Sequence, residues 1–239
     1  MSEKGVFIAI EGGDGSGKGT QSELLRTWLE SELGLRAIKF SFPRYGQDSA
    51  RYAGRYLDGQ YGAASEVHPE LGVLPYAIDR YAAGSEIRDY LGDPSNVVVA
   101  DRYMASNLAH QGAKISDKSN RRQFYEETMG LEYDILGIPR PDINIVLAVA
   151  TGVAQANVDK KDSSSRSYTT KKRDIHEADA GHLDMAGANY RELCELYPEQ
   201  FTRINCMEES GLTQRSIEDI QLDIQRITQE TIGSRGPIL

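Results

Sequence analysis

A glycine-rich run near the N-terminus constrains the fold of this chain more than any other feature. It follows a short apolar segment, Val6–Ile10, and precedes a stretch with helical periodicity. Its glycines permit a tight turn in which successive backbone N–H groups and the N-terminus of the next helix converge on phosphate oxygens. A lysine at its end would contact the β- and γ-phosphates of a nucleotide. The order of strand, loop, lysine and helix predicts a phosphate loop. Its residues are Gly12, Gly13, Asp14, Gly15, Ser16, Gly17, Lys18, Gly19 and Thr20.

One position departs from the usual phosphate-loop pattern. A serine or threonine normally follows the lysine, but here Gly19 follows Lys18 and the hydroxyl comes one residue later, at Thr20. Direct ligation of Mg²⁺ by that hydroxyl is therefore open. Because magnesium commonly keeps several waters, Thr20 could contact the metal through its water shell or contact a phosphate instead.

Apolar segments alternate with longer amphipathic stretches along the chain. This alternation predicts an α/β fold with a parallel five-stranded sheet wrapped by helices. The expected strands are Val6–Ile10, Ala37–Phe42, Val97–Ala100, Ile143–Val149 and Phe201–Ile204, and helical patterns cover Leu24–Leu33, Ala188–Tyr197 and Ile217–Ile232. Tyr45–Tyr90 shows no strand pattern and predicts helices over the sheet edge, with tyrosines as a binding wall. Ligands bind beyond the carboxyl ends of such strands, so polar residues there are site candidates.

Bulk composition narrows the class of protein. A net charge of -9 over 239 residues argues against a general nucleic-acid binder, which needs excess Lys and Arg. Cys194 and Cys206 have neither the number nor the spacing of a disulfide framework or a zinc site, which favours reduced thiols inside the cell. No apolar stretch is long enough for a signal peptide or a membrane span. We therefore expect a single cytoplasmic domain, residues 1–239, without membrane contact.

Four separate blocks resemble those of thymidylate kinases, within the phosphate-loop nucleoside monophosphate kinases. The first is the phosphate loop itself, in which Asp14 occupies the position where adenylate kinases carry proline. The others are Phe42-Pro-Arg-Tyr-Gly46, Tyr76-Ala-Ile-Asp-Arg-Tyr81 and Asp101-Arg-Tyr-Met-Ala-Ser-Asn107, and Leu136–Asp142 is a looser fifth match. The resemblance covers nearly the whole chain and weakens after Thr151. It implies transfer of a phosphoryl group from ATP, with Mg²⁺, to thymidine monophosphate, and a homodimer.

The resemblance assigns roles around the transferred group. Arg102 would hold the acceptor phosphate, Asp14 would face that phosphate, the sugar and the metal, and Asp101 would hold Mg²⁺ through water. Alternatives remain open at this stage. Asp101 and Arg102 could form only a buried salt bridge, and Asp14 could be a turn-forming aspartate.

The resemblance also implies a base site. Tyr76 would stack on thymine while Arg80 and Asn107 read its edge, and a helix would place Tyr76 and Arg80 on one face. Phe42 would form the opposite wall, Tyr45 would approach the phosphate side, and His110 would lie near the sugar. From the residues alone, Tyr76 and Phe42 could equally be core aromatics.

A basic segment, about 159–178, resembles the lid of this family. A closing lid excludes water and can bring a cation to the transferred phosphoryl group. Because Gly15 stands where some thymidylate kinases carry arginine, this chain would need that cation from the lid, and Arg166 is our choice. The same segment could be a solvated loop. Asp174 and Glu177 match a lid-end pattern, with no role assigned.

Two other functions remain as alternatives. The first is a kinase for another nucleoside monophosphate or for a deoxynucleoside, because base choice depends on the shape of the pocket. The second is a binding protein that uses ATP as a switch. Such a protein would leave the arginines of a second phosphate site unused.

Overall fold

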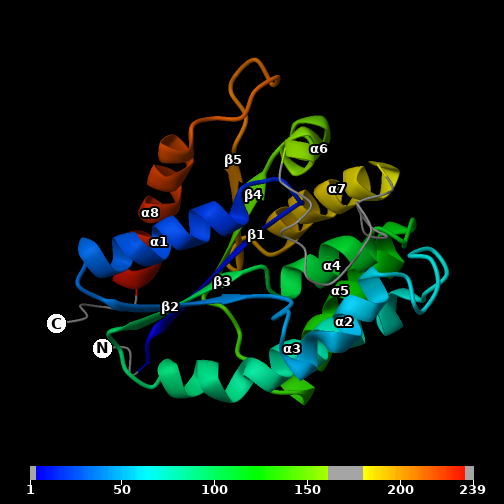
Figure 1. The fold of residues 1–239 in the computed structure, drawn as a ribbon, viewed down its shortest axis with the longest axis horizontal. Coiled ribbons are helices and arrows are strands. Elements are labelled where there is room, and N and C mark those ends of the chain that lie inside the picture. Colours follow the sequence, from blue (N-terminus) through cyan, green and yellow to red (C-terminus); the bar gives the residue numbers. More distant parts are fainter. Residues whose placement is uncertain (1–3, 161–179, 235–239) are drawn as a thin grey trace.

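The computed structural model describes residues 4–160 and 180–234. Its centre is a parallel sheet of β1 (Val6–Gly12), β2 (Arg36–Ser41), β3 (Asn96–Asp101), β4 (Ile143–Ala148) and β5 (Phe201–Asn205). The strand order is β2-β3-β1-β4-β5, so β1 lies in the middle. All five predicted strands are confirmed, with ends that differ by one or two residues. The central position of β1 places the glycine-rich loop at the middle of the carboxyl edge (Figure 1).

Helices cover both faces of the sheet (Figure 1). One face carries α1 (Lys18–Ser31) and α8 (Ile217–Gly233), and the other carries α3 (Pro69–Tyr90), α4 (Met104–Gly112), α5 (Lys118–Met129) and α7 (Ala180–Leu196). Between β2 and α3 lie a 3-10 turn, Asp48–Ala50, and α2 (Arg51–Leu57). A π-helical segment, Gly130–Ile135, follows α5, and α6 (Thr151–Lys160) follows β4. The prediction of helices without strands over Tyr45–Tyr90 is confirmed.

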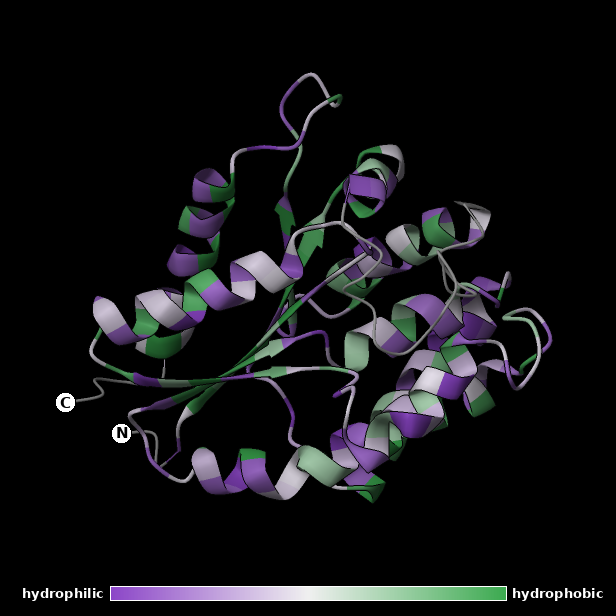
Figure 2. Cartoon of the chain, viewed as in Figure 1, coloured by the Kyte–Doolittle hydropathy of each residue, from purple (hydrophilic) through white to green (hydrophobic). Residues whose placement is uncertain are grey.

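Alternation along β1 explains the two layers. Successive side chains of a strand point to opposite faces. Ile8 and Ile10 therefore pack against α1 and α8, whereas Phe7 and Ala9 pack against the helices of the other face. In Figure 2 the central strands are green over much of their length and the surface helices mix green with purple. The same alternation puts Glu11, a buried carboxylate, on the face of Phe7 and Ala9.

Candidate functional site

The glycine-rich loop adopts the backbone that its glycines permit. Gly12, Gly15 and Gly17 have φ values of 138°, 78° and 95°, which side chains rarely adopt. Gly17 directly precedes α1, so the helix N-terminus faces the loop. Lys18 is buried and its Nζ donates to the carbonyl oxygen of Gly13 at 2.6 Å. Burial, together with the like charge of Arg102, lowers the pKa of Lys18 to about 8. The loop has the shape and the cation of a phosphate site.

Helix α6 lies directly against this loop. A Cβ at Gly15 would overlap the carbonyl oxygen of Ala154 in α6. Asn157 Nδ2 donates to the carbonyl oxygen of Gly15 at 3.0 Å and to Gln214 Oε1 at 2.8 Å. Gln214 Nε2 in turn donates to the carbonyl oxygen of Ser16 at 3.2 Å. Two separate segments therefore hold the loop, and an arginine at position 15 would not fit beneath α6.

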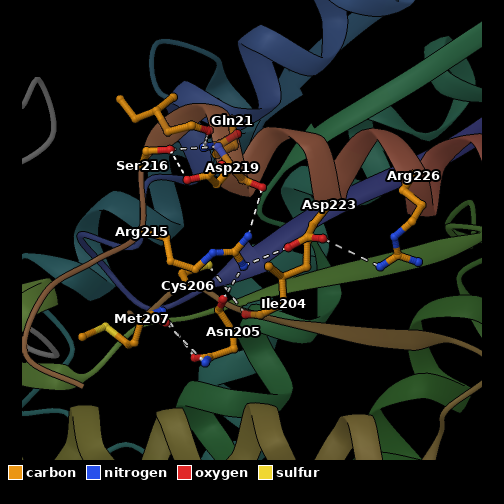
Figure 3. A network of polar contacts seen from close by, with 11 residues as sticks. Gln21, Ile204, Asn205, Cys206, Met207, Arg215, Ser216, Asp219, Asp223 and Arg226 are labelled. Carbon is orange, nitrogen blue, oxygen red and sulfur yellow. Dashed lines mark hydrogen bonds and ion pairs between the residues drawn. The ribbon is translucent and has the colours of Figure 1, made fainter. Parts of the chain in front are cut away.

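The segment between β5 and α8, which carries Gln214, is anchored by Arg215 (Figure 3). The Arg215 guanidinium donates to the carbonyl oxygens of Asn205 and Asp219 and to Asp223 Oδ2, at 2.8, 3.2 and 2.8 Å. Gln21, in α1, donates from Nε2 to the carbonyl oxygen of Ile217 at 2.9 Å. These contacts tie both ends of the segment to β5, α8 and α1.

Arg102 lies between the loop and the end of β3. It has φ 66°, the one positive φ of a non-glycine residue in the described chain. Its guanidinium pairs with Asp14 and donates to the carbonyl oxygen of Gly12 at 3.3 Å. Although burial opposes it, the charges of Arg102 and Lys18 hold the pKa of Asp14 well below its usual range. The ion pair that the sequence left open, between Asp101 and Arg102, is therefore formed by Asp14 and Arg102 instead.

Glu11 supports the strained turn at Arg102, although no sequence pattern marked it as a functional residue. Its Oε1 accepts from the backbone N–H of Tyr103 at 2.8 Å, and its Oε2 accepts from Ser106 Oγ at 2.7 Å. Ser106 also contacts the hydroxyl of Tyr190 at 3.1 Å, so α7 joins the cluster. Burial raises the pKa of Glu11. The strand alternation could have placed this carboxylate inward, but not its partners.

Asp101 and Thr20 were the predicted magnesium residues. Asp101 lies beside the loop, because a Cβ at Gly19 would come within 3.1 Å of Asp101 Oδ2. Thr20 is exposed in the first turn of α1. No group of three or more His, Cys, Asp or Glu side chains in residues 4–160 and 180–234 is placed to hold a metal by itself. Magnesium in such sites uses one or two carboxylates together with substrate phosphates and waters, which Asp101 beside the loop can accommodate.

All seven residues predicted to bind the acceptor line one cavity of about 90 Å³. They come from the end of β2, from α3 and from the segment that begins at the end of β3 and runs through α4. The residues are Phe42, Tyr45, Tyr76, Arg80, Arg102, Asn107 and His110. Asp14 and His110 also border a larger cavity of about 460 Å³ beneath α6 and α7. The two cavities therefore meet at the phosphate loop, which is the arrangement that group transfer between two ligands requires.

Asp79 connects two blocks that are far apart in the sequence. Its buried carboxylate accepts from the backbone N–H of Arg44 at 2.7 Å and from Arg44 Nε at 3.1 Å. Ser49 Oγ donates to the same carboxylate at 2.7 Å. The loop after β2 is thereby held against α3, and Phe42 and Tyr76 come to line the same cavity.

Arg80 and Asn107 share a hydrogen-bond partner, Glu132, that was not among the predicted site residues. Arg80 Nε and Nη2 donate to the two carboxylate oxygens of Glu132 at 2.7 and 2.6 Å. Asn107 Nδ2 donates to Glu132 Oε1 at 3.1 Å. Arg80 is 2% exposed and Glu132 is 0% exposed. Nothing in the local sequence Leu-Glu-Tyr-Asp marks Glu132, which lies in the π-helical segment.

His110 is buried between the two cavities. Its ring stacks on His182 at 5.7 Å and meets Tyr190 edge-on at 6.4 Å. Burial and the charge of Arg102 lower the pKa of His110 to about 3. The imidazole is therefore neutral at neutral pH. Any contact that it makes with a ligand is a neutral hydrogen bond or a packing contact.

The predicted lid falls mostly outside the described residues. Asp159 and Lys160 end α6, whereas Arg166, Asp174 and Glu177 lie in residues 161–179. The other four cations of that segment, Lys161, Lys171, Lys172 and Arg173, lie there as well. Their roles stay predictions.

Comparisons with known proteins agree with the site. The family model described as thymidylate kinase matches residues 10–217. A thymidylate kinase of Mycobacterium tuberculosis is 32% identical over 189 residues, which are 79% of this chain and 85% of the relative. One of Symbiobacterium thermophilum is 29% identical over 245 residues, 96% of this chain and 95% of the relative. The thymidylate kinase structure from Candida albicans, 18% identical, has a TM-score of 0.66 over 97% of this chain and 95% of that chain, a likeness of fold alone.

Proposed function

This chain belongs to the thymidylate kinase family, and we propose that the cavity beside its phosphate loop binds the acceptor nucleotide. The protein is a nucleoside monophosphate kinase that transfers a phosphoryl group from ATP to thymidine monophosphate, giving thymidine diphosphate. One observation carries the site assignment: the Asp14–Arg102 pair lies where the cavity meets the loop. Both partners border the cavity that holds the predicted base readers.

Positioning and charge neutralisation are the main tasks in phosphoryl transfer. In the proposed arrangement, the loop N–H groups and Lys18 hold the β- and γ-phosphates of ATP. The Arg102 fork holds the acceptor phosphate in line with the γ-phosphate. Asp14 fixes the guanidinium through their ion pair, and Glu11 fixes the turn that carries it. Since the positive φ of Arg102 costs free energy, the contacts of Glu11 are what keep this cation aimed at the loop.

We assign Mg²⁺ to the side of the loop where Asp101 lies. Asp101 would hold the ion through its water shell, and Thr20, one residue beyond the usual position, would reach it only through water or a phosphate. When bound, Mg²⁺ would neutralise part of the negative charge on the ATP phosphates.

The thymine would lie between Phe42 and Tyr76, with its edge toward Arg80 and Asn107. Phe42 is 5% exposed and makes a T-shaped contact with Tyr103 at 5.3 Å, so it forms a fixed wall. Tyr76 is partly exposed and meets Tyr56 edge-on at 6.0 Å. His110 would pack near the sugar as a neutral ring.

A side-by-side turnover assay tests this function. The protein is given ATP, Mg²⁺ and each common nucleoside monophosphate, with the deoxynucleosides as a second panel. We expect thymidine monophosphate to give the highest kcat/KM. The Lys18→Ala variant should lose turnover while its circular dichroism stays native, because it removes a phosphate contact outside the core. Preference for another monophosphate or for a deoxynucleoside would contradict the acceptor assignment. Binding of ATP without turnover of any acceptor would favour the switch alternative.

We further propose that the protein forms a homodimer through α3. Four large apolar side chains recur along one face of this helix at spacings of three and four residues. They are Leu71, Leu74, Ile78 and Tyr81, exposed by 60, 41, 45 and 59%. This row runs along one face of α3 and carries no charge. Such a surface suits a self-complementary contact with a second copy of the chain.

Sedimentation tests the dimer. Ile78→Glu should give a monomer at concentrations where the parent chain is dimeric, whereas Leu222→Glu, on the exposed face of α8 at 62% exposure, should not. A monomeric parent chain would rule out the dimer.

Two remaining assignments are also proposals. The described residues form one sheet with one hydrophobic core on each face, and both cavities lie at the carboxyl edge of this sheet. This arrangement supports a single functional domain over residues 1–239. No helix of the described residues is long and apolar enough to cross a membrane. Cys194 and Cys206 are free thiols, which fits the cytoplasmic setting expected from the sequence.

A further inference from the structure

Glu132 is a buried carboxylate without an assigned part in phosphoryl transfer, and it contacts both predicted base readers. It is 0% exposed, and its partners Arg80 and Asn107 are each 2% exposed. Burying an ion pair costs desolvation free energy that the pair often fails to recover, so an apolar cluster of similar volume would stabilise the fold as well. The presence of Glu132 therefore calls for a role other than stability.

The contacts of Asn107 fix which way its amide faces. Its Nδ2 donates to Glu132 Oε1 at 3.1 Å and to the carbonyl oxygen of Val73 at 3.3 Å. Both partners are acceptors, so only the NH₂ end of the amide can face them, and both of its hydrogens are used. The carbonyl end of Asn107 is thus the end left for the cavity that the residue lines. Asn107 therefore presents a hydrogen-bond acceptor, its carbonyl oxygen, to the cavity.

The contacts of Arg80 fix its fork in the same way. A guanidinium has five N–H groups. Two of them meet the oxygens of Glu132, and Nη1 donates to the carbonyl oxygen of Tyr103 at 3.3 Å. The Tyr103 ring also lies 5.7 Å from the guanidinium carbon. The N–H groups not used in these contacts belong to Nη1 and Nη2, so Arg80 presents only donors to the cavity.

We propose that Glu132 is a specificity-determining residue that sets the hydrogen-bond polarity of the base site and so selects a 4-keto pyrimidine over cytosine. A donor from Arg80 beside an acceptor from Asn107 matches the O4 and N3–H of thymine. Cytosine shows the reverse pattern, an N4 amine and a bare N3, and would place donor against donor. Uracil shares the thymine edge, so this polarity does not separate those two bases. The inference rests on the proposed function of the cavity.

The Glu132→Gln variant tests the polarity directly. Glutamine keeps the volume, but its NH₂ group replaces one of the two acceptors. These are Oε2, which accepts from Arg80 Nε, and Oε1, which accepts from both Arg80 Nη2 and Asn107 Nδ2. Where the new NH₂ meets Asn107, the Asn107 amide keeps only the Val73 carbonyl oxygen, at 3.3 Å, as an acceptor. Asn107 can then turn its carbonyl toward position 132 and its NH₂ toward the cavity. We expect the ratio of kcat/KM for dTMP to that for dCMP to fall at least tenfold, and the ratio for dUMP to dCMP to fall with it. Glu192→Gln is the matched control. Glu192 also holds an arginine with both oxygens, Arg121 at 2.7 and 3.1 Å, but does not line the cavity.

A second probe uses the unaltered protein. N3-methyl dTMP lacks the N3–H that Asn107 would accept and should be turned over at least tenfold less efficiently than dTMP. Equal use of the two nucleotides would overturn the polarity scheme, whether or not Glu132→Gln folds. A folded Glu132→Gln variant with an unchanged dTMP to dCMP ratio would overturn the role of Glu132 while leaving the kinase function intact. Failure of the parent protein to use dTMP at all would instead contradict the function on which this inference rests.

Discussion

The Arg102→Ala variant can show whether Arg102 binds the acceptor phosphate or serves only to hold the structure of the loop. The side chain is 19% exposed, pairs with Asp14 and lies within 3.4 Å of Ser106 Oγ. Alanine keeps a Cβ, so the positive φ of 66° remains strained in both proteins. The comparison of Arg102→Ala with the parent chain therefore reports the loss of the charged fork and not a change in backbone preference.

The expected loss of kcat/KM in Arg102→Ala follows from the burial of the Arg102 guanidinium. Truncating one partner of a desolvated charge pair costs about 2 to 5 kcal/mol. At 1.36 kcal/mol per factor of ten, kcat/KM for dTMP should fall by about 30-fold to about 5,000-fold. ATP binding should respond differently. The charge of Arg102 contributes to the lowered pKa of Lys18, so its removal leaves Lys18 more firmly protonated and should not weaken ATP binding.

The assay measures kcat/KM for dTMP at saturating ATP and, separately, the equilibrium affinity for ATP. Arg36→Ala is the control, because Arg36 pairs with Asp93 at the surface, where its side chain is 61% exposed. Exposed pairs contribute about 0 to 1 kcal/mol, and we expect this variant to match the parent in both measurements. Equal losses of dTMP use and ATP affinity in Arg102→Ala would rule out a specific contact between Arg102 and the acceptor phosphate. They would mean that Arg102 serves only to hold Asp14 and the loop.

Two further predictions concern stability. Gly15→Ala should lower the free energy of unfolding in urea by at least about 1 to 3 kcal/mol, since its Cβ would overlap the Ala154 carbonyl oxygen at a positive φ. Gly13→Ala, where a Cβ meets nothing within 4 Å, should not. In the folded chain the pKa of His110 is about 3, so the imidazole stays neutral until the pH falls close to that value. In the unfolded chain its pKa is near 6.5. The unfolded state therefore binds the extra proton between these values. Stability falls as pH falls below 6.5, by about 2 kcal/mol at pH 5. His110→Phe should remove that decline, and an unchanged acid profile would show that the imidazole is already charged in the fold.

The strands and the phosphate loop were predictable because their signals are local. Each strand is a short apolar run, and the loop residues are contiguous. Helix α4 was not predicted, because it is only nine residues long and its polar side chains line a buried cavity instead of facing solvent. They are Ser106, Asn107, His110 and Gln111.

The partners of the site residues could not be predicted, because they lie far apart in the chain. Arg80 and Glu132 are 52 positions apart, and Asp14 and Arg102 are 88. Ion pairs of this kind depend on how strands and helices are ordered in space. The family resemblance supplied the cavity-lining residues in advance, but Glu11 and Glu132 carry no motif and became visible only through their contacts.

A crystal structure of the protein with dTMP and an unreactive ATP analogue would show whether the cavity beside the phosphate loop is the acceptor site. We predict the acceptor phosphate on the Arg102 guanidinium, the triphosphate on residues 12–20, and the thymine edge against Arg80 and Asn107. The O4 atom should lie within hydrogen-bond distance of an Arg80 nitrogen, and N3 within that distance of Asn107 Oδ1. Density for dTMP in the larger cavity beneath α6 and α7, with no phosphate on the Arg102 guanidinium, would contradict the assignment of the acceptor site.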